Sequence, residues 1–300
     1  MESQTSNPSA GGNPFSIDGE WHRGNLHMHS TNSDGTRSPE DAMAWYCDAG
    51  YDFAVLSDHR VVSDTTALAT SGFITIPGIE MHGPDPFTGE PYHILGIGVK
   101  SFERSDDAWG PQEAIDRVNA DDGIAVMAHP YWLGQSAFNM RELDGFVGME
   151  VFNSVCDLTR GKGFSNITWD EYLLQSGRTW GFATDDVHWK HGSEGRGWVM
   201  VRTTDETSAG LVAALRRGEF YSSMGPEIRD IRVESGEIRV QTSPVSRITI
   251  VAARANGSNY CAVSDQLTEV THELRGTEQY VRIEIEDKDG LRAWSNPLMF

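Results

Sequence analysis

Histidine and acidic residues recur in short clusters along the chain, and side chains of these types bind metal ions. His27 and His29 stand two apart within GNLHMHSTNSDG, residues 24–35. We expect this segment to be a short strand, in which side chains two apart point to the same face, so that both imidazoles can reach one ion. A His-x-His pair is a weak signal alone, and its meaning depends on the residues that follow.

Further His, Asp and Glu residues come after apolar segments. A single histidine is more often structural or exposed than a ligand. A set of imidazoles and carboxylates without thiolates, however, is typical of Zn, Mn or Fe(II) sites and not of iron–sulfur clusters. The candidate metal ligands are His27, His29, Asp34, His59, Glu80, His93, His129, Asp186 and His188. Because this set exceeds the need of one ion and includes carboxylates able to bridge, we expect two or three divalent transition metal ions.

A centre of this kind predicts hydrolysis. Several bound ions turn water into hydroxide near neutral pH and hold both the attacking and the leaving oxygen of a displacement. Oxygen activation by mononuclear iron is the rival chemistry, but it uses two histidines and one carboxylate, far fewer than this chain offers. The chain has no Gly-x-Ser-x-Gly elbow, no Walker loop and no Gly-x-Gly-x-x-Gly after a strand, so serine nucleophiles and nucleotide cofactors are not indicated.

Apolar segments of strand length must position these side chains. The expected strands lie at 52–57, 73–79, 92–99, 124–128 and 178–184. Capping residues, prolines and terminal glycines predict helices at 38–50, 111–121, 168–177 and 208–217. This order predicts an α/β barrel of parallel strands, whose carboxyl ends open on one face, so that His27 and His188 can meet there.

The ends of the chain differ from this barrel pattern. Residues 1–17 are rich in Ser, Asn, Gly and Pro, which predicts a disordered tail and not a signal peptide. From residue 227 onward, short alternating segments separated by Gly, Ser and Asn predict a small all-β appendage. We therefore expect a barrel over residues 18–226 and a β-rich domain over residues 227–300.

The composition limits the partners. With 24 Lys and Arg against 44 Asp and Glu, the formal net charge is -20, which disfavours long nucleic acids and anionic membranes and favours a small-molecule substrate. No apolar run has the roughly 18 residues that a membrane helix needs. Three cysteines far apart argue against a disulfide framework. A soluble protein is expected, cytoplasmic by default; the oligomeric state is left open.

The motifs HMHSTNSDG, LSDHR, GIEMHG, HILGIG, AHP and DDVH, in this order, resemble those of the PHP (polymerase and histidinol phosphatase) family over about residues 20–225. The resemblance implies a distorted (β/α)7 barrel with up to three metal ions. It implies one ion bound by His27, His29, Glu80 and Asp186. It implies a second bound by Glu80, His93 and His129, and a third bound by Asp34, His59 and His188.

The stretch ALRRGEFYSSMGP and the ending DGLRAWSNPLMF resemble a PHP subgroup that includes bacterial carbaryl (N-methylcarbamate) hydrolases and many proteins called phosphoesterases. Two hypotheses follow: a phosphoesterase acting on a small phosphate ester, which we prefer, and a hydrolase of a carbamate, carboxylic ester or amide. Both would use the same metal centre. We expect catalytic roles for Arg60, Glu80 and His188.

Several residues outside the ligand set could have either a functional or a structural role. Arg60 follows the SDH motif where similar proteins often carry Asn or Asp; it could hold a phosphate or carboxylate, or pair at the surface with Asp58 or Asp64. Glu150 and Asn153 could line the pocket, or Glu150 could face solvent. Asp-x-His spacing favours Asp186 over Asp185 as the ligand. Side chains that could wall a substrate or bind an anion, or equally pack in the core or face solvent, are Trp132, Trp189, Trp198, Arg160, Lys162 and Arg196.

Overall fold

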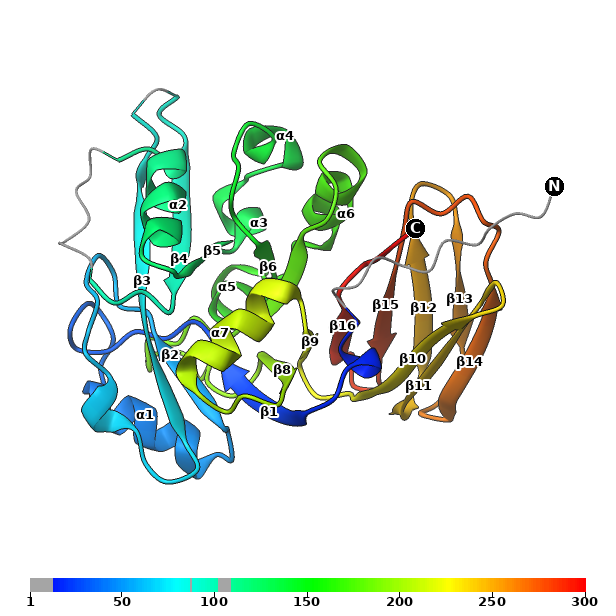
Figure 1. Cartoon of the computed structure of the whole chain (residues 1–300), viewed down its shortest axis with the longest axis horizontal. Helices are drawn as coiled ribbons and strands as arrows, with labels where there is room; N and C mark the ends of the chain where they lie inside the picture. The colour runs from blue at the N-terminus through cyan, green and yellow to red at the C-terminus, as the bar shows by residue number, and fades with distance from the viewer. Residues whose placement is uncertain (1–12, 87, 102–108) are drawn as a thin grey trace.

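The computed structural model describes residues 13–86, 88–101 and 109–300 (Figure 1). Its α/β part contains the strands β1 (Glu20–Asn25), β2 (Phe53–Leu56), β3 (Ile74–Pro84), β4 (Pro91–Ile97), β5 (Ile124–Met127), β6 (Gly148–Asn153), β7 (Trp180–Thr184), β8 (Trp198–Thr203) and β9 (Phe220–Ser223). The helices are α1 (Pro39–Asp48), α2 (Pro111–Ala120), α3 (Pro130–Leu133), α4 (Ala137–Met140), α5 (Ser154–Arg160), α6 (Asn166–Gln175) and α7 (Ser208–Arg217), with short 3-10 turns η1 (Pro14–Ser16) and η2 (Thr66–Leu68).

The β-rich part follows these elements along the chain. Its strands are β10 (Ile228–Glu234), β11 (Glu237–Val245), β12 (Arg247–Ala252), β13 (Gly257–Cys261), β14 (Leu267–Glu273), β15 (Tyr280–Glu286), β16 (Arg292–Ser295) and β17 (Leu298–Met299). β10, β11 and β14 form a separate three-stranded sheet. The expected change to β structure near residue 227 falls between β9 and β10.

One large mixed sheet runs through both parts, in the order β13-β12-β15-β16-β9-β8-β1-β2-β3-β4-β5-β6-β7. β1, β2 and β3 pair in parallel, as do β5, β6 and β7. β4 runs antiparallel to both of its neighbours. The expectation that all strands of the α/β part run parallel is therefore wrong. Residues 85–90 alone separate β3 from β4, and so short a link makes a hairpin, whereas a parallel pair needs a crossover of a dozen or more residues.

Strand pairing does not close the sheet into a ring among the described residues, because β7 ends the hydrogen-bonded path. Side chains hold the seam between β7 and β9 instead. Ser222 Oγ accepts the N–H of Ala183 at 3.0 Å and donates to the carbonyl of Gly181 at 2.8 Å. Asn296 Oδ1 accepts the N–H of Gly181 at 3.0 Å, and its Nδ2 donates to the carbonyl of Phe220 at 3.1 Å.

The β-rich part is joined to the α/β part along β9 and β16, which pair antiparallel with Ala293 opposite Ser223 (Figure 1). Ile231 and Val240 of the small sheet pack in one apolar core with Ile250 and Ile283 of the large sheet. The expected appendage is therefore a two-sheet unit that shares a continuous sheet with the α/β part.

The first described residues belong to this core. Residues 1–12 of the expected tail lie outside the described residues, but Phe15 in η1 is buried and stacks on Tyr221 with ring centroids 6.0 Å apart. The ordered chain thus begins before the expected boundary at residue 18. Within the described parts of the chain, no helix combines the length and the apolar character that crossing a membrane requires.

Local signals explain most helix starts. Ser38 caps α1 as expected, its side chain accepting the N–H of Asp41. The expected start of α6 at Thr168 is wrong. The helix begins at Asn166, and Thr168, which we expected to cap it, lies inside the helix and is buried.

Candidate metal centre

The segments that follow β1 and β7 carry the first ligand candidates and run side by side. Met28 bridges Val187 in parallel, and the N–H of His29 donates to the carbonyl of Val187 at 3.0 Å. His27 and His29 therefore lie just beyond β1, not within a strand as expected, but the alternation of side chains persists. Met28 packs into an apolar core, while the two histidines face each other with their Nε2 atoms 3.1 Å apart.

The first ligand group consists of His27, His29, Glu80 and Asp186. Nε2 of His27 lies 3.2 Å from Glu80 Oε2 and 3.2 Å from Asp186 Oδ1. Nε2 of His29 lies 3.3 Å and 3.1 Å from the same two oxygens. With the 3.1 Å between the two Nε2 atoms, these five distances match the edges of a regular tetrahedron whose centre lies about 2 Å from each corner, which is the usual distance between Zn and nitrogen or oxygen ligands.

The second group shares Glu80. Its Oε1 lies 2.7 Å from His93 Nδ1 and 3.2 Å from His129 Nε2, while Oε2 belongs to the first group. One carboxylate thus faces two groups with a different oxygen toward each. The strand pair β3 and β4 places Glu80 and His93 on neighbouring strands, and His129 follows β5 directly.

The third group contains Asp34, His59 and His188, with His29 as a fourth member. Asp34 Oδ1 lies 3.2 Å from His188 Nε2 and 3.7 Å from His59 Nε2. His29 approaches through Nδ1, 3.9 Å from the same oxygen. The structure thus brings all nine candidates together, and His29 stands between the first and third groups, which the sequence did not indicate.

Hydrogen bonds fix which ring nitrogen faces the centre in two of these histidines. Nδ1 of His188 lies 2.9 Å from the carbonyl of Asp186, so it carries the proton and Nε2 is free to coordinate. Nδ1 of His27 lies 2.7 Å from Glu150 Oε1 with the same result. By contrast, Nδ1 of His29 and of His129 are buried without a hydrogen-bond partner among the described residues.

The charges of the centre are strongly coupled. Burial alone would raise the pKa of Glu80, but His27, His59 and the other imidazoles around it hold that pKa well below its usual range. Burial would lower the pKa of His29, but hydrogen bonds to Asp186 and Glu80 raise it to about 9. The pKa of His27 and of His129 is raised as well, by the same carboxylates, whereas burial lowers the pKa of His59 to about 4. Ionised carboxylates, converging nitrogens and tetrahedral spacing fit a polynuclear metal site.

Glu150 is the residue that sequence reasoning judged least well. It was expected to line the pocket or to face solvent, but its side chain is fully buried on β6 and contacts the ligand groups. The available signal was a glutamate within the apolar run GMEVFN, which the structure shows to be the fully buried strand β6.

Asp185 and Asp58 have structural roles. Asp185 is fully buried, accepts the hydroxyl of Tyr46 at 2.6 Å and the N–H of Gly195 at 2.7 Å, and orders the loop after the DDVH motif. Burial raises its pKa to about 6, against the hydrogen bonds that lower it. Asp58 accepts both the N–H and the hydroxyl of Ser30. Asp186, and not Asp185, is therefore the member of the centre.

The Arg60 side chain has neither of the two orientations that the sequence suggested, toward a bound anion or toward Asp58 or Asp64. Its backbone turns into the left-handed region with φ 61, and its Nη2 donates to the carbonyl of His82 at 3.1 Å. Asp58 is occupied by Ser30, and Asp64 accepts the N–H of Thr66. Arg60 is not among the residues that line the pocket over the ligand groups.

A pocket of about 250 Å³ opens over the three groups. Besides ligand candidates, its lining residues are Trp132, Val155, Cys156, Thr159 and Arg160. Trp132 stands 5.1 Å from the ring of His129 and is 38% exposed, so it can contact a ligand. Trp189 and Trp198 instead pack beneath Arg37 and Arg23. Lys162 and Arg196 are not among the lining residues either.

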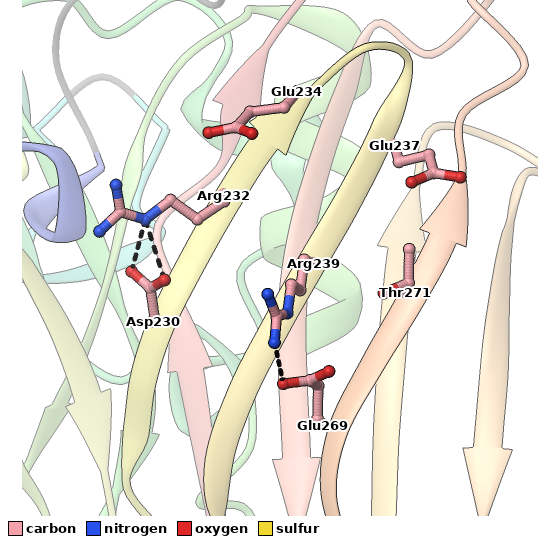
Figure 2. Close-up of a pocket in the computed structure, with 7 residues that line it drawn as sticks. All are labelled: Asp230, Arg232, Glu234, Glu237, Arg239, Glu269 and Thr271. Atoms are coloured by element: carbon pink, nitrogen blue, oxygen red, sulfur yellow. Dashed lines mark hydrogen bonds and ion pairs between the residues drawn. The ribbon is translucent and has the colours of Figure 1, made fainter.

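A larger hollow, of about 560 Å³, lies far from this chemistry on the open face of β10, β11 and β14 (Figure 2). Arg232 pairs there with Asp230 at 2.9 Å, and Arg239 pairs with Glu269 at 2.7 Å. Along these strands, side chains alternate between the apolar core and solvent, and the residues that line the hollow are the ones that face solvent. We interpret the hollow as a solvated sheet face with mutually paired charges.

Comparison with known proteins gives the fold. No family model matches the chain, and no curated protein matches it. The structure is similar to a two-domain protein from Bacteroides vulgatus ATCC 8482 that contains a predicted PHP-like metal-dependent phosphoesterase. The TM-score is 0.52 and the identity 14%, and the match covers 100% of this chain and 98% of that chain. At this identity the likeness shows the fold alone, but it includes the β-rich part.

Two other solved structures match about half of the chain. An amidohydrolase from Chromobacterium violaceum has a TM-score of 0.44 and 14% identity, covering 55% of this chain and 87% of that chain. A protein from Bifidobacterium adolescentis ATCC 15703, proposed to be a metal-dependent phosphoesterase, has a TM-score of 0.39 and 14% identity, covering 56% and 88%. These TM-scores are too low to support an argument.

Proposed function

We propose that the chain is a PHP-type metal-dependent hydrolase whose reaction is cleavage of a small phosphate ester. The observation that carries this proposal is the convergence of three His and carboxylate groups at one pocket whose wall includes Arg160. We propose two or three Mn, Zn or Fe ions, bound by the residue sets named above. When bound, such ions supply Lewis-acid activation of water and stabilise negative charge on the ester oxygens.

The protein side chains have separate tasks in this proposal. Glu80 fixes the distance between two subsites because each of its oxygens belongs to one group. His188 presents Nε2 toward Asp34 because its Nδ1–H donates to a backbone carbonyl. Arg160 donates Nη1–H to the carbonyl of Thr159 at 2.9 Å, and its remaining donors can bind the non-bridging oxygens of a phosphate.

In this proposal Arg160 binds the phosphate, which is the role first expected of Arg60. Arg60 contacts His82, whose ring lies 4.6 Å from that of His59. In this proposal Arg60 supports the third group through His82 and does not touch the substrate.

The alternative is hydrolysis of a carbamate, carboxylic ester or amide at the same centre. Trp132, Val155 and Cys156 favour it, because they give the pocket an apolar wall next to a single lining cation, Arg160, among the described residues. An apolar wall suits a neutral ester with an aromatic group.

A matched set of substrates distinguishes the phosphoesterase from the carbamate or ester hydrolase. Phenyl phosphate, phenyl acetate and phenyl N-methylcarbamate release the same phenol, so their rates differ only through the group that is attacked. Chelated protein would be reloaded with Mn, Zn or Fe(II) in turn. We expect phenyl phosphate to be hydrolysed at least tenfold faster than the others. Preferential hydrolysis of the acetate or carbamate would establish the alternative, and no turnover with any metal would contradict both.

A further inference from the structure

We propose that Glu150, assisted by Asn153, is a positioning residue that holds the first and second ligand groups at a fixed spacing. The inference rests on the proposed metal centre and assigns a role to a carboxylate that binds no ion itself. Glu150 is fully buried and none of the three ligand groups contains it. A buried carboxylate is costly unless it is fully hydrogen-bonded, so its partners indicate its purpose.

The first oxygen of Glu150 orients the first group. Oε1 accepts Nδ1–H of His27 and the hydroxyl of Thr184, each at 2.7 Å. The bond to His27 keeps a proton on Nδ1, so that Nε2, which faces Glu80 and Asp186, is the nitrogen that would bind a cation. It also makes that nitrogen a stronger donor to a cation, as carboxylates bonded to metal-binding histidines do.

The second oxygen holds the backbone of the second group. Oε2 accepts the N–H of His129 at 2.8 Å. His129 has φ 31, in the left-handed region that costs energy for a residue with a Cβ, so a fixed partner is needed to keep it there. The turn at His129 is what aims its ring back toward Glu80.

Asn153 connects the same carboxylate to a third ligand. Its Nδ2 donates to Glu150 Oε2 at 2.8 Å and to Asp186 Oδ2 at 3.1 Å. Its Oδ1 accepts the N–H of Cys156 and thereby begins α5, the helix that supplies one wall of the pocket. Glu150 and Asn153 thus join both ligand groups and the pocket wall in one buried network.

The test is metal binding by the full-length chain with Glu150→Gln. The amide cannot replace the carboxylate in either orientation, because its NH2 group would face the donors of His129 and Asn153 at the Oε2 position or those of His27 and Thr184 at the Oε1 position. We expect the variant to bind Zn tenfold to a hundredfold more weakly and to alter the visible spectrum of the Co(II)-loaded protein. Asp185→Asn is the matched control, because it also converts a fully buried, multiply hydrogen-bonded carboxylate to an amide but contacts no ligand side chain.

Asn153→Ser tests the inference if Glu150→Gln does not fold. Serine can still cap α5 but lacks the donor that joins Glu150 to Asp186, so we expect the same weakened binding and altered spectrum. Wild-type Zn affinity and an unchanged Co(II) spectrum in both variants, or equal changes in Asp185→Asn, would overturn the inference. Failure of the wild-type chain to bind more than one ion would instead contradict the proposed function itself.

Discussion

Glu80 faces two ligand groups with two different oxygens, and this division makes it the most sensitive residue of the centre. Glu80→Gln leaves one carbonyl oxygen that can bind a cation and an NH2 group that cannot. We therefore expect the variant to lose at least one equivalent of bound metal, measured by elemental analysis after reloading, and most of its turnover.

Glu278→Gln is the control for Glu80→Gln, because Glu278 is a buried carboxylate that accepts backbone N–H groups in the β-rich part. It should keep the full metal content. Full metal content in Glu80→Gln as well would show that Glu80 does not bridge.

Arg160 tests which ester the pocket prefers. Arg160→Ala removes a charge-assisted contact to a phosphate, worth about 1.5–3 kcal/mol, so kcat/KM for phenyl phosphate should fall roughly tenfold to a hundredfold or slightly more, while phenyl acetate changes little. Lys162→Ala is the control, because Lys162 lies 5.6 Å from the ring of Tyr131 and does not line the pocket. Equal effects of Arg160→Ala on both esters would remove the support that Arg160 gives to a phosphoesterase.

Sequence reasoning found the nine ligand candidates because metal ligands are few in type and follow recognisable motifs. It misjudged Arg60 because proximity to His59 in the chain does not give the direction of a side chain when the backbone turns to φ 61. It left Glu150 open because its partners His27 and Thr184 are far away in sequence, and only the packed sheet brings them to it.

At the scale of elements, α6 and β15 are joined by an ion pair between the buried Arg282 and the partly exposed Asp170. Arg282 is 1% exposed and donates from both Nε and Nη2 to Asp170, at 2.8 Å and 2.7 Å. Arg282→Ala should lower the free energy of unfolding by about 3 kcal/mol, because it empties a packed site and leaves Asp170 with only the hydroxyl of Tyr280 as a partner. Denaturant unfolding measures this, and metal content should not change.

The exposed pair of Arg239 and Glu269 provides the comparison for Arg282→Ala (Figure 2). Its loss in Arg239→Ala should leave the free energy of unfolding nearly unchanged, because water screens the two charges. Similar costs for the two variants would mean that the contact between α6 and β15 adds little to stability.

Helices with strong local signals were predictable from sequence, and strand directions were not. Ser38 and Pro39 define the start of α1 through contacts within four residues. The direction of β4 depends on a short link, and the pairing of β16 with β9 joins residues about seventy positions apart. Alternation predicts that these segments are strands but gives no information about their partners.

At the scale of the molecule, metal binding should stabilise the whole fold. The site gathers several ionised carboxylates, and a ligand that binds only the native state adds about 2.7 kcal/mol at a hundred times its dissociation constant. We expect the melting temperature to rise by several degrees when Zn or Mn is added to chelated protein, as followed by calorimetry. Potassium chloride at equal ionic strength is the control. A melting temperature that responds equally to both salts would contradict a built metal site.

The two parts of the molecule should not be separable. Removing residues 227–300 would expose Phe15 and Tyr221, which pack in the core of the β-rich part, and the edge of β9, and it would delete Asn296 from the seam beside β7. We expect a fragment of residues 13–226 to be unfolded or aggregated by circular dichroism and size-exclusion chromatography. A monomeric fragment with native helix content and bound metal would show that the α/β part is autonomous.

The seam also sets an order of events during synthesis. The N–H of Gly181 on β7 donates to Asn296, and the carbonyl of Phe220 on β9 accepts from it, so the seam is not complete until residue 296 has left the ribosome. β7 leads directly into Asp186 and His188. All nine ligand candidates therefore leave the ribosome before the seam is complete, and we expect metal capture to follow translation of the β-rich part.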